Sequence, residues 1–87
     1  MVTREDIEAI NNVILMERET GHCLFDFDDY YHDMIQMAEI LGIKMFYNEE
    51  EEEWMFYNAI DQVRTKTALS YYYERLGGGN QNGRNRK

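Results

Sequence analysis

Residues 45–58 read MFYNEEEEEWMFYN, so five consecutive glutamates separate two copies of the tetrapeptide Met-Phe-Tyr-Asn. Adjacent carboxylates repel one another, and an exposed run of them weakens a compact fold unless it caps an element or meets a partner. The ten-residue offset between the copies is too short for a repeat protein, whose units span ~20–50 residues. We therefore interpret the repeat as coincidence and the acidic run as the feature that points to function.

The negative charge is concentrated in the middle of the chain. The whole chain has a net charge of −8, whereas residues 26–53 hold ten acids and one base, a net charge of −9. This density argues against direct binding of nucleic acid or of an anionic membrane by the folded body. It favours a basic partner protein, a cation, or simple solubility.

Length and composition predict one small acidic domain, residues 1–76, followed by a flexible basic tail, residues 77–87. A chain of this size buries about 60–65% of its unfolded surface, so a second copy or a partner would reinforce a modest core. The single cysteine, Cys23, excludes an internal disulfide and fits a reducing cytoplasm. No apolar run approaches the ~20 residues of a membrane span, and the N-terminus does not read as a signal peptide.

The first predicted helix covers residues 4–19. Thr3 is placed to cap its free N–H groups, and Asp6 is a shorter substitute for the glutamate of a capping box. Gly21 follows the last periodic turn, where a left-handed cap is expected. The apolar stripe of this helix contains Ile7, Ile10 and Ile14.

The second predicted helix covers residues 27–41 and starts at Asp26 or Asp28. Apolar side chains recur at spacings of three and four residues along it, as in an amphipathic helix. Gly42 ends it. The stripe contains Phe27, Tyr30, Tyr31, Met34, Met37, Ala38 and Leu41.

The third predicted helix starts after an ambiguous stretch, residues 43–47. This stretch has strand-like side chains, but no convincing partner strand, so we interpret it as an apolar linker. Asn48 then caps a helix whose first turns hold Glu49–Glu53, close to the positive end of the helix dipole. The helix spans residues 49–76, or breaks near residues 66–70, where weaker helix formers occur.

These elements predict an all-α fold, a small three-helix domain in which a helical hairpin packs on a long C-terminal helix. Tyr71, Tyr72 and Tyr73 point to three sides of the last helix, so at least one ring is exposed. Exposed tyrosines are enriched at binding surfaces, although they also cover a thin core. The six methionines have the same two interpretations, as interface residues or as core filling.

Metal-binding and catalytic patterns are weak in this chain. Possible ligands gather within residues 22–33, but their spacing matches neither a zinc site nor a calcium-binding loop. No nucleophile, phosphate-loop or metalloprotease motif is present. An exposed acidic run does not raise a carboxyl pKa as an active site does. We therefore expect no enzyme, no cofactor and no metal. The ligand candidates weighed were His22, Cys23, Asp26, Asp28, Asp29, His32 and Asp33.

The acidic surface favours a protein-binding inhibitor that mimics nucleic acid. Duplex DNA presents one charge per ~1.7 Å of axis, and carboxylates at comparable density attract the basic site of a nucleic-acid-handling enzyme. In size and charge the chain is similar to phage-encoded anti-defence inhibitors, although it shares no sequence motif with them. Its predicted location is the cytoplasm, which is that of the host cell if the chain is phage-encoded. The acidic residues predicted to bind the partner are Asp28, Asp29, Asp33, Glu49, Glu50, Glu51, Glu52, Glu53 and Asp61. The aromatic anchors are Tyr47, Trp54 and Tyr57.

Two other hypotheses stay open. In the first, the chain is a structural subunit or adaptor that forms a homodimer through Met55, Ile60 and Val63, and its acids only keep it soluble. In the second, it is an antitoxin-like regulator whose basic tail touches nucleic acid. Three basic residues are too few for appreciable affinity alone.

Overall fold

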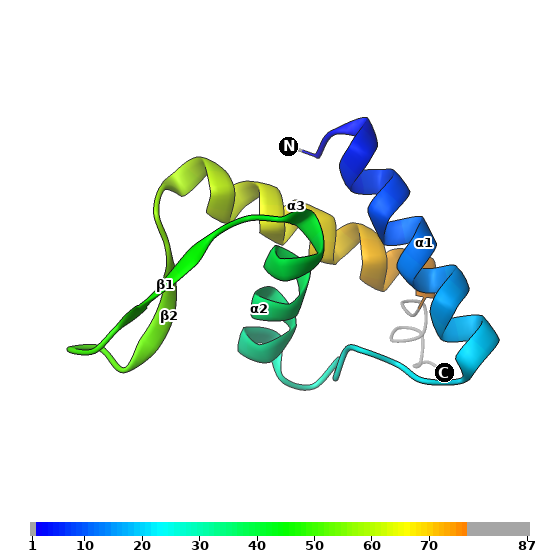
Figure 1. Cartoon of the computed structure of the whole chain (residues 1–87), viewed down its shortest axis with the longest axis horizontal. Helices are drawn as coiled ribbons and strands as arrows, with labels where there is room; N and C mark the ends of the chain where they lie inside the picture. Colours follow the sequence, from blue (N-terminus) through cyan, green and yellow to red (C-terminus); the bar gives the residue numbers. More distant parts are fainter. Residues whose placement is uncertain (1, 77–87) are drawn as a thin grey trace.

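The computed structural model describes residues 2–76, which are mostly helical with one small two-stranded sheet. Figure 1 shows the last helix running along the length of the molecule, with the other two helices packed against it and the strands projecting at one end. The predicted tail, residues 77–87, lies outside the described residues. Within the described part, no helix combines the length and apolarity needed to cross a membrane. The elements in order are α1 (Arg4–Thr20), α2 (Tyr30–Leu41), β1 (Met45–Asn48), β2 (Glu53–Phe56) and α3 (Ala59–Leu76).

Helix α1 begins and ends where its capping residues predict. The Thr3 hydroxyl oxygen accepts the backbone N–H of Asp6 at 3.0 Å, and the Asp6 carboxylate accepts that of Thr3 at 3.0 Å. The capping box therefore forms with aspartate in the place of glutamate. At the other end, Gly21 has a φ of 72° and donates its N–H to the Glu17 carbonyl at 2.8 Å. Glycine adopts this left-handed conformation without the penalty that a Cβ brings.

Helix α2 begins at Tyr30, later than the predicted residue 27. Phe27 has a φ of 67°, which no right-handed helix contains, so the chain stays irregular up to Asp29. The Asp29 side chain accepts the backbone N–H of His32 at 3.1 Å and caps the helix. Gly42, with a φ of 75°, ends the helix as predicted.

Strands β1 and β2 form an antiparallel hairpin, so the all-α prediction is wrong for this segment. Residues 43–47 are not a mere apolar linker, because Met45 to Asn48 pair with Phe56 to Glu53. The partner strand was not predicted, because residues 53–56 had been included in the third predicted helix, residues 49–76. Aromatic side chains favour strands when they can pair across the sheet.

Helix α3 begins at Ala59, ten residues after the predicted start, and runs without the break that its weaker helix formers allow. Its cap is Asn58, whose side chain accepts the backbone N–H of Asp61 at 2.8 Å. Asn48 was predicted to cap this helix and instead accepts the N–H of Glu51 at 3.1 Å within the hairpin loop. Each Met-Phe-Tyr-Asn copy thus ends in an asparagine that caps the turn after it, so the copies share a local role that we had not expected.

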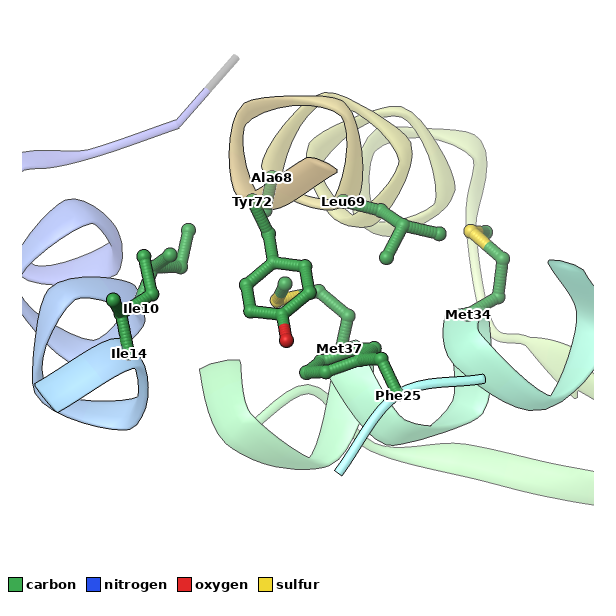
Figure 2. Packing of buried hydrophobic residues seen from close by; sticks show 8 residues of the cluster. All are labelled: Ile10, Ile14, Phe25, Met34, Met37, Ala68, Leu69 and Tyr72. Carbon is green, nitrogen blue, oxygen red and sulfur yellow. The ribbon is translucent and has the colours of Figure 1, made fainter. Parts of the chain in front are cut away.

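Tyr72 lies at the centre of the core. This residue of α3 is fully buried and sits between Ile10 and Ile14 of α1 and Met37 of α2 (Figure 2). Phe25, from the connector between α1 and α2, packs on the Tyr72 ring with centroids 4.1 Å apart. Burial of one large apolar side chain stabilises a fold by about 1.5–3 kcal/mol. As predicted, the first two helices both contact the third.

Candidate partner-binding hairpin

The five glutamates, Glu49–Glu53, form the loop of the hairpin and the first residue of β2, and all are exposed. They do not form the first turn of a helix. Asn48 shapes the loop, because its side-chain oxygen accepts the N–H groups of Glu50 and Glu51 at 2.9 and 3.1 Å. Its backbone carbonyl accepts the N–H of Glu52 at 2.6 Å. The loop is therefore an ordered turn at the projecting end of the molecule (Figure 1).

The predicted aromatic anchors flank this loop. Tyr47 and Trp54 lie opposite each other on the two strands, with ring centroids 5.6 Å apart in an edge-to-face arrangement. They are 47% and 44% exposed. Tyr57, at the base of the hairpin, is 64% exposed and packs on Phe46 with centroids 4.9 Å apart. The hairpin thus carries acidic side chains at its tip and half-exposed rings behind them.

Asp28 and Asp29 are exposed just before α2. The Tyr31 hydroxyl in the first turn of α2 accepts the backbone N–H of Trp54. This bond fixes the start of α2 against β2. Asp29 also serves as the helix cap, so part of its hydrogen-bonding capacity is already used.

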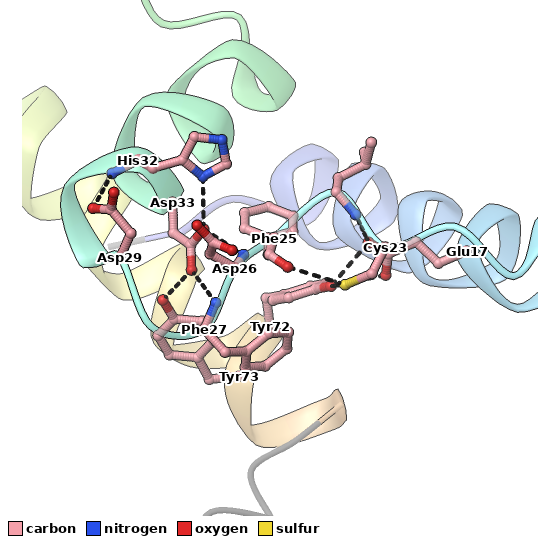
Figure 3. Close-up of polar contacts among 11 residues, drawn as sticks. Glu17, Cys23, Phe25, Asp26, Phe27, Asp29, His32, Asp33, Tyr72 and Tyr73 are labelled. Carbon is pink, nitrogen blue, oxygen red and sulfur yellow. Dashed lines mark hydrogen bonds and ion pairs between the residues drawn. The ribbon is translucent and has the colours of Figure 1, made fainter.

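Asp33 is not an exposed partner-binding residue, and this part of the predicted site is corrected. Its side chain is fully buried and accepts the N–H groups of Asp26 and Phe27 at 2.8 and 2.9 Å and the Tyr73 hydroxyl at 2.6 Å (Figure 3). Burial raises the pKa of the Asp33 carboxyl, but these hydrogen bonds outweigh it and hold the pKa below its usual range. Asp33, in the first turn of α2, therefore joins α2 to both the irregular connector and α3.

Asp61 is partly buried in the first turn of α3, behind the hairpin and not at its tip. A carboxylate there is favourable beside the positive end of the helix dipole. Its charge, after that of Asp6, also helps to raise the pKa of Arg64. Asp61 has a local structural role whether or not a partner contacts it.

Two further carboxylates, Asp6 and Glu17, are buried against α3, and neither contact was predicted. Arg64 donates two hydrogen bonds to Asp6, at 2.6 and 2.7 Å, and holds the pKa of that carboxyl down to about 2. Tyr72 donates to Glu17 at 2.8 Å. Asp6 was predicted only as a capping residue, and no local pattern identifies the partners of Asp6 and Glu17 on α3.

Several of the candidate metal ligands between residues 22 and 33 make other contacts. Cys23 contacts the Phe25 carbonyl at 3.2 Å and lies 3.7 Å from the Tyr72 hydroxyl. His32 pairs with Asp33 through Nδ1 at 3.1 Å. Across residues 2–76, no group of three histidine, cysteine, aspartate or glutamate side chains is arranged to hold a metal ion.

A groove of about 470 Å³ lies between the start of α2, the hairpin and the start of α3. We call it the hairpin groove. It was not predicted, because its walls come from three separate segments of the chain. No pattern in the sequence signals it, since Tyr30 and Tyr31 read as part of the apolar stripe of the second helix. Its main apolar walls are Tyr30, Tyr31, Met34, Trp54, Met55 and Phe56.

No protein-family model matches this chain, and no curated protein or solved structure does so either. Function is therefore inferred from the geometry of the hairpin and its surroundings.

Proposed function

We propose that this protein inhibits a nucleic-acid-handling protein by inserting its acidic hairpin into the partner's basic nucleic-acid site. The observation that carries the proposal is an ordered loop of exposed glutamates, Glu49–Glu52, at the projecting end of a hairpin with half-exposed aromatic rings. A concentrated negative charge steers association with a basic cleft, and buried aromatic side chains then supply contact energy.

The backbone of the loop supports a functional role for the charge. Glu52 has a φ of 57°, in the left-handed region where glycine or asparagine is the usual residue. A non-glycine residue in this conformation costs about 1–2 kcal/mol, and neighbouring carboxylates add repulsion. A sequence selected only for a stable turn would favour glycine at this position of the four-residue loop. The chain thus keeps a glutamate at a position that disfavours it, as functional sites often do.

The position of the loop also supports insertion into a cleft. The longest dimension of the described chain is 40 Å, and the hairpin occupies one end of it. The Asn48 side chain orders the loop before any partner binds, so less conformational entropy is lost on association. Asp28 and Asp29 extend the negative field toward α2.

The experiment is capture of proteins from a host-cell extract on the immobilised chain, followed by elution with duplex DNA or with salt. We expect the captured protein to bind nucleic acid and to be displaced by DNA, because both ligands occupy the same site. The triple variant Glu50→Lys, Glu51→Lys, Glu52→Lys should lose capture. The control Glu5→Lys, Glu8→Lys, Glu19→Lys changes the same charge on exposed positions of α1 and should retain it.

Two results would contradict this function. One is capture that survives reversal of the three loop glutamates. The other is a captured protein that nucleic acid does not displace at any salt concentration, since this protein and the nucleic acid that it mimics cannot occupy one site together.

A homodimer is the second candidate, favoured by apolar exposure near the start of α3. Ile60 is 78% exposed and Val63 is 52% exposed, and both follow the exposed Tyr57. Met55, the third residue of the predicted interface, is partly buried in the hairpin groove. Sedimentation of wild type and Ile60→Glu separates the two functions, because only a dimer through this face dissociates in the variant.

A further inference from the structure

Three half-exposed aromatic rings line the hairpin groove. Tyr30 is 50% exposed, Tyr31 is 45% exposed and Trp54 is 44% exposed, and all three line the groove. Its volume of about 470 Å³ falls within the ~300–1,000 Å³ of small-ligand pockets. Aromatic residues and methionine are the types enriched where proteins bind each other. The groove therefore has the composition of a pocket for an anchoring side chain.

The charge around the groove selects for a basic occupant. Among the lining residues in the described range 2–76, Glu53 is the only charged one, and none is basic. Half of the lining residues, six of twelve, also belong to residues 26–53, the segment whose net charge is −9. An occupant with flanking lysines or arginines gains favourable electrostatic contacts there, whereas an acidic one is repelled.

The edge of β2 excludes one mode of binding at this point. An added strand needs the free N–H and carbonyl groups of a sheet edge. Here the N–H of Trp54 already donates to the Tyr31 hydroxyl, which sits over that edge. The occupant is therefore a side chain inserted between α2 and β2, not a strand paired with β2.

We propose that the hairpin groove receives a large apolar side chain from a basic segment of the partner protein. This inference rests on the proposed function and adds the chemistry of a second contact. The acidic tip takes the basic site, and the groove takes an apolar residue that lies beside it. Specificity for one basic protein among many then comes from the groove, because charge alone does not distinguish them.

Trp54 is the only tryptophan in the chain, so its fluorescence reports directly on the groove. The probe is a short synthetic arginine-rich peptide with a central leucine–phenylalanine pair. Two control peptides are used, one with alanines in place of the apolar pair and one with serines in place of the arginines. We expect the first peptide to shift Trp54 emission and to bind about tenfold more tightly than either control.

Ala59→Leu tests the groove itself, because Ala59 is exposed and lines it. The larger side chain should narrow the groove and reduce the advantage of the apolar pair. Ser70→Leu makes a comparable change on the exposed surface of α3 outside the groove and should have no effect. Circular dichroism verifies that both variants stay folded.

The failures of the two proposals are distinguishable. Unchanged peptide affinity in Ala59→Leu, or equal affinity of the alanine control peptide for wild type, overturns the groove inference and leaves the acidic tip standing. Neutralising the loop with Glu50→Gln, Glu51→Gln and Glu52→Gln should reduce affinity for both arginine-rich peptides and weaken the salt dependence. If it does not, the tip proposal fails while binding in the groove stands.

Discussion

The hydroxyl of Tyr72 donates to the carboxylate of Glu17, with the two oxygens at 2.8 and 3.0 Å, inside the core between α3 and α1. The same carboxylate accepts the backbone N–H of Leu24 at 2.8 Å. One buried side chain therefore joins both helices to the connector that leads to α2 (Figure 3). Such a network is stabilising only while every member has a partner.

Tyr72→Phe should lower the free energy of unfolding by about 1–3 kcal/mol, because it leaves the buried Glu17 carboxylate short of a donor. The control is Tyr71→Phe, which removes a hydroxyl from a partly buried ring that packs under Arg75 at 5.4 Å. The control should change stability by less than about 0.5 kcal/mol. Urea denaturation measures both, and equal effects would contradict a special role for the Tyr72–Glu17 bond.

Asp6→Asn should make the protein less sensitive to acid. The pKa of Asp6 falls from 3.8 to about 2 on folding, chiefly through the hydrogen bonds from Arg64, with burial acting against them. A lowered pKa contributes stability that is fully present above the unfolded value and is lost as pH falls through the folded value. We expect the variant to lose about 1–2 kcal/mol at neutral pH. That difference should shrink between pH 4 and pH 2, as measured by urea unfolding at each pH.

The ring of His32 should titrate above its ordinary pKa of 6.5, because it bonds to the Asp33 carboxylate. A raised pKa contributes stability that is present below the unfolded value and lost as pH rises through the folded one. NMR titration of the ring protons checks this directly. In Asp33→Asn the pKa of His32 should move back toward 6.5; an unchanged pKa would show that Asp33 is not its cause.

Asp33→Asn should also destabilise the fold by about 1–3 kcal/mol, because one amide nitrogen replaces an oxygen that accepts backbone N–H groups. The same change at Asp29 is a matched control, since asparagine caps a helix as well as aspartate does. Asp29 is exposed and accepts one N–H at the start of α2. Thermal denaturation should therefore separate the two variants clearly.

Glu52→Gly should stabilise the hairpin and weaken partner binding at the same time. Glycine relieves the left-handed conformation at a φ of 57°, worth about 0.5–1 kcal/mol. Glu51→Gly removes the same charge from the neighbouring loop position and should not stabilise the protein. Urea unfolding and the capture experiment together test the trade-off, which fails if both variants have equal stability.

The local chemistry of single segments was readable from the sequence. Helix α1 begins at the capping box of Thr3 and Asp6, as predicted, and α1 and α2 end at Gly21 and Gly42. These boundaries are predictable because a cap needs only neighbouring residues and one backbone conformation. Apolar periodicity likewise located the first two helices to within a few residues. The concentration of negative charge in residues 26–53 is also a property of the sequence alone.

The hairpin was decided by contacts that no single segment contains. Asn48 followed by glutamates satisfies the rules for a helix start and for a loop equally well. What selects the loop is the pairing of β1 with β2, the packing of Phe56 on the core and the bond between Tyr31 and Trp54. These groups meet only after the chain has folded.

The acidic residues near α2 make the same point about the site. Asp28, Asp29 and Asp33 look alike in the sequence, and all three were predicted to face a partner. Tyr73, forty residues beyond Asp33, covers that one carboxylate and leaves the other two exposed. Charge is a property of the composition. Whether a given carboxylate is buried depends on which residues from distant parts of the sequence pack against it, and only tertiary packing determines those contacts.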